Sequence, residues 1–202
     1  MIRLVFWLEE YSAQVLLEGL IPRLFVGEQL PANLNLEYHC FNGKSDLERN
    51  ICRKIHKYYS PDNLQVAHLI LRDQDAGDCK QVKQKLLNMV SDVDDIMVLV
   101  RIACHELESF YLADLAAVET ALQISNLARR QNHATYRNPD TKNSSADLLD
   151  KLTAGKYQKV SGSRAIGKVL DIKNQRSPSF SHLVEAIQKL LVACGVSVEL
   201  FC

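Results

Sequence analysis

The fold is decided by a short apolar run, Val66-Ala67-His68-Leu69-Ile70-Leu71, which is followed almost at once by two carboxylates, Asp73 and Asp75. A short apolar run bounded by polar turns is typical of a buried strand in an open α/β sheet. In such sheets ligands bind at the carboxyl ends of the strands. The position of Asp73 and Asp75 therefore predicts a ligand-binding site at the edge of the sheet where the strands end.

A second run of the same kind, Ile2–Leu8, ends in the acidic pair Glu9 and Glu10. If the two strands are neighbours, acidic residues that are far apart in the sequence converge in space. Like charges about 4 Å apart repel by roughly 4 kcal/mol at an effective dielectric constant of about 20. We therefore expect a compensating cation, and a hard divalent ion such as Mg²⁺ is the usual one.

The rest of the sheet domain is predicted by alternating strand and helix patterns. Further strands are expected at residues 34–41 and 96–103. Helices are expected in four places: around Leu17–Leu24, after a capping box formed by Ser45 and Glu48, from about Asp78 to Val90, and from Glu106 to about Val118. Four such alternations predict an α/β fold with a mostly parallel, four-stranded, Rossmann-like sheet and helices on both faces.

The pattern changes near residue 126, so we predict an α/β domain over residues 1–125 and a basic linker with a helical lobe over residues 126–202. Residues 129–145 are polar and lack a strand pattern, which indicates a linker or mobile loop. A strongly periodic helix is expected from Ser177-Pro178 to Gly195, and we expect it to pack back on the sheet domain.

The charges are unevenly distributed along the 202 residues. Lys plus Arg and Asp plus Glu are equal at 24 each, yet residues 129–176 carry eleven basic and four acidic side chains. That segment therefore carries a net charge of +7 and the remainder −7. The basic segment is predicted to hold a nucleic-acid backbone, or else to be a solvated helical surface.

The spacing of the cysteines and the hydropathy of the chain indicate the cellular compartment in which the protein is expected. Six cysteines are scattered without a CxxC pair, and the N-terminus lacks the features of a secretory signal. No stretch approaches the roughly 20 apolar residues of a membrane span. We expect a cytoplasmic protein without a membrane partner.

Each predicted strand end supplies charged groups to one edge of the sheet: Glu9 and Glu10, Lys44, Asp73 and Asp75, and Glu106 and Glu108. Alternation along an extended Asp73-Gln74-Asp75 would point both aspartates the same way. The acidic groups are candidate ligands for Mg²⁺ or Mn²⁺. The alternative is that they cap helix N-termini, where carboxylates are common.

The two glutamates after the fourth strand are not equivalent. Glu106 and Glu108 lie about 200° apart around a helix of 3.6 residues per turn, so both cannot easily face one ion. Because Glu106 is nearer the strand end, we predict it as the metal-side carboxylate and Glu108 as a supporting or capping group.

Other metal and phosphate motifs are excluded by their spacing. The sequence from Asp73 to Gln84 fails the calcium-loop pattern, because position six is Asp78 instead of glycine. Adjacent pairs such as His39-Cys40 cannot easily share one zinc ion. Gly43-Lys44-Ser45 lacks the earlier glycine of a phosphate-binding loop, since Tyr38 stands there.

A glutamate after the first strand and an Asp-x-Asp after the third resemble the Toprim domain of topoisomerases, bacterial primases and overcoming-lysogenization-defect nucleases. Five segments resemble, in order, those of an uncharacterised bacterial family, domain of unknown function 4276: residues 8–13, 41–47, 73–79, 101–110 and 177–180. The family resemblance spans nearly the whole chain. It implies a Toprim-like fold and a gene often found beside an ABC-type ATPase in a presumed phage-defence operon.

The resemblance also implies roles for particular residues. Glu9 takes the Toprim glutamate position, Asp73 and Asp75 take the Asp-x-Asp positions, and Lys159 takes that of the late lysine of the nuclease branch. An acidic residue often lies four positions after the first glutamate in that branch, but Ala13 stands there in this chain. A second metal would need Glu10, Glu106 or Glu108 as a substitute.

The expected function is that of a Mg²⁺- or Mn²⁺-dependent nuclease that cleaves a phosphodiester of nucleic acid, and DNA is the expected partner ahead of RNA. The metal would polarise the phosphoryl oxygen and activate water, and Lys44 or Lys159 would stabilise the developing charge. The rival expectation is a non-catalytic regulator or adaptor that docks on an ABC-type ATPase and keeps only a structural cation site.

Overall fold

A computed structural model describes residues 1–58, 65–91 and 97–198. These residues form a four-stranded, all-parallel sheet in the order β2-β1-β3-β4. The strands are β1 (Ile2–Leu8), β2 (Leu34–Cys40), β3 (Val66–Asp73) and β4 (Met97–Ala103). The predicted fold class is confirmed, and only the expected first residue of the fourth strand, Ile96, lies outside the described residues.

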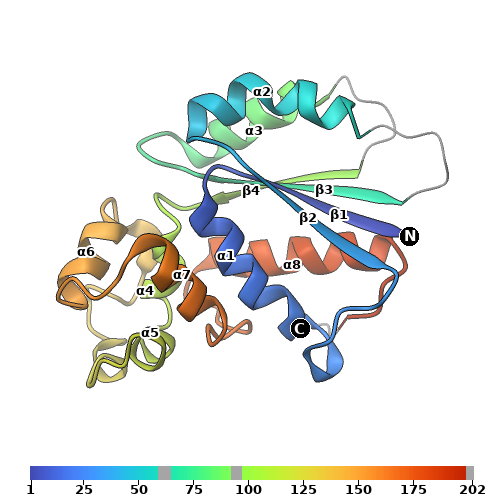
Figure 1. The fold of residues 1–202 in the computed structure, drawn as a ribbon. Coiled ribbons are helices and arrows are strands. Elements are labelled where there is room, and N and C mark those ends of the chain that lie inside the picture. The colour runs from blue at the N-terminus through green and yellow to red at the C-terminus, as the bar shows by residue number, and fades with distance from the viewer. Residues whose placement is uncertain (59–64, 92–96, 199–202) are drawn as a thin grey trace.

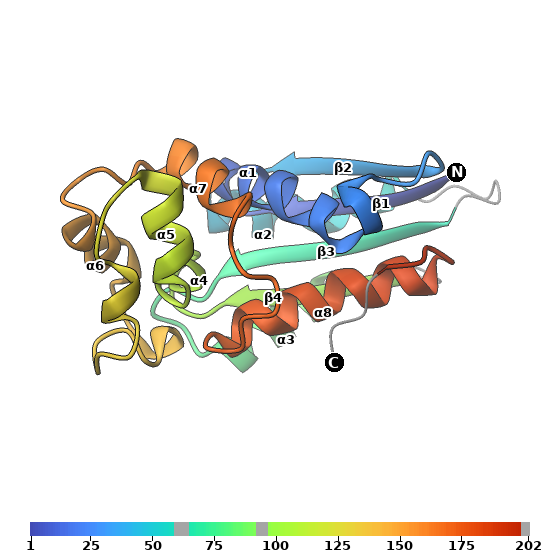
Figure 2. The same ribbon diagram turned by 90° about the horizontal axis from the view of Figure 1, so that it is seen from below.

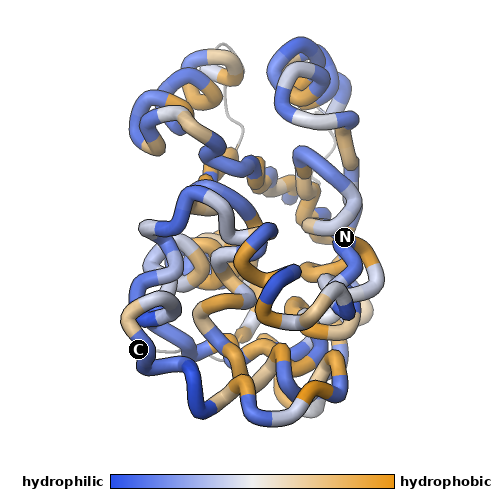
Figure 3. Tube along the Cα trace, turned by 90° about the vertical axis from the view of Figure 1, so that its left-hand side faces the viewer, coloured by the Kyte–Doolittle hydropathy of each residue, from blue (hydrophilic) through white to orange (hydrophobic). Residues whose placement is uncertain are grey.

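Helices cover both faces of the sheet (Figure 1). One face carries α2 (Lys44–His56) and α3 (Cys79–Met89), and the other carries α1 (Tyr11–Leu20) and α8 (Pro178–Ala193). Along these elements hydrophobic and hydrophilic residues alternate (Figure 3), as expected where one side of each element is buried.

The remaining helices gather beyond the carboxyl ends of β3 and β4, as Figure 2 shows. They are α4 (Glu108–Leu112), α5 (Leu115–Leu122), α6 (Ser145–Leu152) and α7 (Lys159–Gly167). The expected single helix after the fourth strand is two helices, because Asp114 leaves the helical conformation and its side chain caps α5 by accepting from the Ala117 N–H.

Alternation along the strands sends successive side chains to two different cores. In β3, Leu69 and Leu71 join the core beneath α1 and α8, whereas Ile70 joins the core beneath α2 and α3. The first core is continuous with the buried faces of the C-terminal helices, because it also holds residues of α6, α7 and α8. Residues before and after position 126 thus contribute to one hydrophobic core.

Two local predictions differ from the structure. The capping box of Ser45 and Glu48 is wrong, because α2 begins at Lys44, two residues before the start that a Ser45 N-cap requires, and its N-cap residue Gly43 makes no side-chain cap. The segment 129–145 was predicted as a linker or mobile loop. It contains short 3-10 turns that are fixed by hydrogen bonds, among them those from the Gln131 amide to the carbonyls of Leu112 and Tyr136.

A close helix–helix contact brings α7 to the sheet domain. A Cβ atom on Gly167 would lie 2.6 Å from the carbonyl oxygen of Leu16 in α1, so only glycine permits this approach. The Arg23 guanidinium then donates to the carbonyls of Gly167 and Leu170, at 3.3 and 2.6 Å. The contact packs the C-terminal end of α7, whose first residue is Lys159, against α1.

Gly167→Ala should therefore destabilise the protein by about 1–3 kcal/mol, because the added methyl group overpacks the contact between α1 and α7. Urea unfolding measures this free energy. Ser161→Ala changes an exposed position of the same helix and should alter stability by less than about 0.5 kcal/mol. Equal stability of the two variants would show that α7 does not depend on this contact.

Candidate functional site

The candidate site lies at the carboxyl ends of β1 and β3, which are adjacent in the sheet. The chain passes from β1 to β2 on one side and later to β3 on the other side, so the strand order reverses between β1 and β3. Ligands of open α/β sheets bind at such switch points. Glu9 and Glu10 follow β1, and Asp73 is the last residue of β3.

Asp73 is the central group of the site. Its carboxyl group lies largely out of solvent, on the same side of β3 as Leu71. The two carboxyl oxygens of Asp73 make no hydrogen bond or ion pair with any other described residue. Burial raises the pKa of Asp73 well above its usual range, the neighbouring carboxylates Glu9, Glu108 and Glu10 raise it further, and Lys159 opposes them.

Glu108 enters the site from the first turn of α4 and is 1% exposed. Its Oε1 accepts a hydrogen bond of 2.9 Å from the Tyr157 hydroxyl. Burial raises the pKa of Glu108, although Lys159 and Tyr157 both favour its charged form. The side chain is thus held beside Asp73 in surroundings that disfavour a second negative charge.

Lys159 is the positively charged residue near Asp73 and Glu108. Its Nζ lies 2.6 Å from Oε1 of Glu10, and it interacts electrostatically with Glu108 and Asp73. Burial lowers the pKa of Lys159, but these carboxylates outweigh burial, so the pKa is raised and the side chain stays charged. Lys159 thus partly compensates the charge that Glu10, Asp73 and Glu108 carry when ionised.

A separate ion-pair network occupies the other face of the sheet edge. Arg72 points opposite to Asp73 and its side chain is only 6% exposed. Its guanidinium lies 3.7 Å from Glu9, 3.2 Å from Glu48 and 3.7 Å from Asp75. Lys44 pairs with the same Asp75 at 2.9 Å, which raises the pKa of the lysine through their hydrogen bond.

Glu9 connects the two faces. Its Oε2 accepts a hydrogen bond of 3.2 Å from the backbone N–H of Asp73 and lies near Arg72. Burial raises the pKa of Glu9, the Asp73 N–H lowers it, and the charge of Asp75 raises it again. We call Glu9, Glu10, Asp73 and Glu108 the carboxylate cluster.

The prediction that Asp73 and Asp75 point the same way is wrong. Asp75 has a left-handed backbone with φ of 56°, so the chain has already left the extended conformation on which the alternation depends. Asp73 faces the carboxylate cluster, whereas Asp75 forms ion pairs with Lys44 and Arg72. Lys44 accordingly lies with Asp75, apart from Lys159.

The predicted positions of Glu106 and Glu108 are reversed. The Oε2 atom of Glu106 accepts a 2.8 Å hydrogen bond from the Ala146 N–H and so caps the start of α6. Glu108 instead lies beside Asp73. The cause is His105, whose φ of 59° turns the chain sharply before α4, so distance along the sequence did not decide which glutamate reaches the site.

Sequence reasoning missed Arg72 and Tyr157. A charged residue inside an otherwise apolar strand was the available signal for Arg72, since a buried charge needs partners. Tyr157 offers no such local signal, because it reaches Glu108 from a segment 49 residues away.

The donor chemistry of the carboxylate cluster fits a hard divalent cation, because Mg²⁺ and Mn²⁺ prefer carboxylate oxygens and those of Asp73 are not hydrogen-bonded to any residue that the structure describes. The arrangement is not closed around an ion. Within residues 1–58, 65–91 and 97–198, no three His, Cys, Asp or Glu side chains are gathered tightly enough to hold a metal. Side-chain rotation of Glu9, Glu10 or Glu108 toward Asp73 would be needed.

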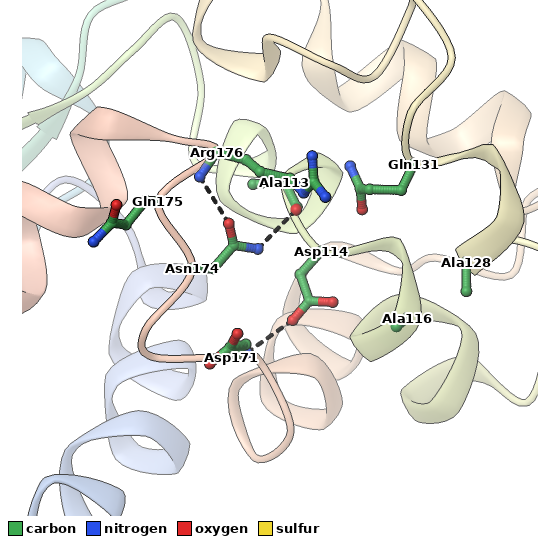
Figure 4. A pocket seen from close by; sticks show the side chains of 9 residues that line it. All are labelled: Ala113, Asp114, Ala116, Ala128, Gln131, Asp171, Asn174, Gln175 and Arg176. Atoms are coloured by element: carbon green, nitrogen blue, oxygen red, sulfur yellow. Dashed lines mark hydrogen bonds between the residues drawn. The ribbon is translucent and has the colours of Figure 1, made fainter. Parts of the chain in front are cut away.

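A polar hollow of about 540 Å³ lies elsewhere, at the junction of α4, α5 and the segment before α8 (Figure 4). Its polar side chains are committed to the fold: Asp114 Oδ2 accepts from the Asp171 N–H, and the Asn174 amide donates to the Ala113 carbonyl. This hollow therefore joins the helices at the junction and shares no residue with the carboxylate cluster.

The chain belongs to the family described as Domain of unknown function (DUF4276), whose model matches residues 8–188. The match includes all four residues of the carboxylate cluster as well as Tyr157 and Lys159. No curated protein and no solved structure matches the chain significantly. In the described part of the chain, no helix combines the length and apolar character required to cross a membrane.

Replacing Asp73 by asparagine should stabilise the metal-free protein, because it removes a poorly solvated charge from among other carboxylates. The folded-state pKa of Asp73 is raised above its unfolded value, so the folded protein binds more protons. The stability that this protonation provides at acid pH is lost as pH rises through the raised pKa. The advantage of Asp73→Asn should be small near about pH 4 and should grow toward about pH 8.

Urea unfolding in the presence of a chelator at several pH values measures this difference. Asp75→Asn is the matched control: it weakens ion pairs with Lys44 and Arg72 and should give no gain at any of these pH values. Parallel stability profiles for wild type and Asp73→Asn would contradict the assigned environment of Asp73.

Proposed function

We propose that this DUF4276 protein is a Mg²⁺- or Mn²⁺-dependent phosphodiesterase that acts on nucleic acid at the carboxylate cluster. The observation that carries the proposal is the Asp73 carboxyl group, which makes no hydrogen bond or ion pair with any described residue and lies near three further carboxylates at the switch point of a parallel sheet. Unpaired carboxyl oxygens at this place are suited to a hard cation.

The roles follow from position. Asp73 would hold the metal together with Glu9, Glu10 and Glu108. The bound ion would polarise a phosphoryl oxygen and lower the pKa of a coordinated water. Lys159 is half exposed beside Glu10, where its charge can stabilise negative charge that develops on the phosphoryl group.

The Toprim likeness supports this proposal in one respect and limits it in another. Glu9 follows the first strand and the Asp73-Gln74-Asp75 segment follows the third, as in Toprim nucleases, and these strands are neighbours. Asp75, however, is paired with Lys44 and Arg72, and Ala13 replaces a frequent acidic position. A one-metal site is therefore proposed, with Asp75 outside it.

The basic segment 129–176 supports a nucleic-acid substrate, because its excess positive charge can hold a phosphate backbone. Its cations are not equivalent, because Lys159 and Arg164 are paired with Glu10 and Glu18. Lys156 and Lys168 are exposed, and their side chains make no ion pair with any described residue. These two lysines are the better candidates for phosphate contacts.

A non-catalytic adaptor of an ABC-type ATPase is the second candidate. It is favoured by the ion pairs of Glu10 with Lys159 and of Glu9 with Arg72, which neutralise part of the edge without any metal. Such an adaptor would use the cluster only to stabilise the fold. Metal-dependent cleavage by the purified protein separates the two candidates.

Calorimetric titration with Mn²⁺ should show saturable binding to the wild type that Asp73→Ala lacks. With plasmid DNA and Mn²⁺ or Mg²⁺, the wild type should nick or linearise the substrate, and the variant should be slower by more than about 100-fold. Asp147→Ala, which removes an exposed carboxylate from α6, should match the wild type in both assays.

Removing the metal with a chelator should abolish cleavage, and adding Mn²⁺ in excess should restore it. Saturable Mn²⁺ binding without cleavage of DNA or tRNA, with and without the ATPase, would favour the adaptor. Equal Mn²⁺ binding by wild type and Asp73→Ala would exclude the proposed site.

The substrate prediction has its own test. Lys156→Ala/Lys168→Ala should weaken DNA binding and reduce the slope of log affinity against log salt by about 1.4–1.8, because two phosphate contacts are lost. The control variant Lys57→Ala/Lys80→Ala removes two exposed lysines, Lys57 directly after α2 and Lys80 in α3, and should leave the slope unchanged. Equal slopes in all three proteins would assign the basic segment to another role.

A further inference from the structure

The segment between α6 and α7 reaches the sheet edge through a single side chain, Tyr157. This residue is 7% exposed and its hydroxyl donates to Oε1 of Glu108 at 2.9 Å. The neighbouring hydroxyl of Ser163 lies 3.2 Å away, but its own proton is directed to the carbonyl of Lys159, at 2.5 Å. The Tyr157 proton is therefore available to Glu108.

Tyr157 is held both by its ring and by its backbone. A Cβ atom on Gly162 would lie 2.5 Å from the ring, so α7 presents a bare backbone against which the ring packs. The backbone N–H of Tyr157 donates to Oγ1 of Thr153 at the end of α6. The hydroxyl thus has little freedom to leave Glu108.

The first residue of α7 pairs with a second carboxylate of the cluster. Lys159 lies two residues after Tyr157 and pairs with Glu10 through its Nζ atom. Tyr157 and Lys159 together hold two members of the carboxylate cluster, one from α4 and one from the start of α1. The helical lobe is therefore part of the site and not only its neighbour.

We propose that Tyr157 is a positioning residue for metal binding: its hydroxyl holds one oxygen of Glu108 and leaves the other oxygen directed to a cation at Asp73. The inference rests on the metal site proposed above and names the residue that prepares it. Hydrogen-bonded partners that orient a metal ligand contribute substantially to metal affinity.

The test is a Mn²⁺ titration of the full chain in three forms. Tyr157→Phe keeps the ring and removes the hydroxyl, and should weaken Mn²⁺ affinity by about 10–100-fold. The control is Tyr38→Phe: the Tyr38 ring stacks on that of Phe6 with 5.1 Å between centroids, and its hydroxyl makes no hydrogen bond with any described residue. Tyr38→Phe should change the affinity by less than about 2-fold.

Thermal unfolding without metal separates positioning from a merely structural role, which would lower the unfolding temperature and leave the Mn²⁺ Kd unchanged. Gly162→Ala provides a second variant that keeps the hydroxyl but displaces the ring, and it should also weaken Mn²⁺ binding. Unchanged Kd in folded Tyr157→Phe and Gly162→Ala overturns the inference alone. Absence of Asp73-dependent Mn²⁺ binding in the wild type overturns the proposed metal site and this inference together.

Discussion

The constraint on which the site depends is the gathering of carboxylates in a place that solvent reaches poorly. Asp73, Glu108 and Glu9 all have raised pKa values, and burial is the largest cause in each case. Charges of one sign in such surroundings must be protonated, paired or bound to a cation. Lys159 and Arg72 provide pairing on the two faces of the sheet edge: Arg72 belongs to β3, and the packing of α7 places Lys159.

Placement of Lys159 is a matter of helix packing. The residue is at the start of α7, and α7 lies against α1 because Gly167 allows its backbone to reach Leu16. The position of Lys159 thus depends on a backbone contact between α1 and α7 that Gly167 permits, several residues away from the lysine. The structure gives a physical reason for the sheet and the helical lobe to share one core, since separating them would leave Glu10 and Glu108 without their partners.

Much of this architecture could be predicted from the sequence. Strands such as Val66–Asp73 are short, apolar and bounded by polar residues, so their positions and the parallel sheet follow from local patterns, as does the approach of Glu9 to Asp73. The identity of the fourth carboxylate could not be predicted, because it depends on one left-handed residue, His105. The contact of Tyr157 with Glu108 could not be predicted either, since long-range contacts between helices leave no periodic signal in the sequence.

The charges of Glu10, Asp73, Glu108 and Lys159 do not balance when all four groups are ionised. Glu10, Asp73 and Glu108 would carry three negative charges if all were ionised, and Lys159 returns one positive charge. Two protons or one divalent cation would restore neutrality, and the raised pKa values of Asp73 and Glu108 are the mark of the first solution. A metal ion that entered would displace these protons, because carboxylate ligands bind in their ionised form. Protonation and metal binding are therefore alternative ways to stabilise the same arrangement of side chains, and the Tyr157 hydroxyl, which donates to Glu108, favours the ionised form that a metal requires.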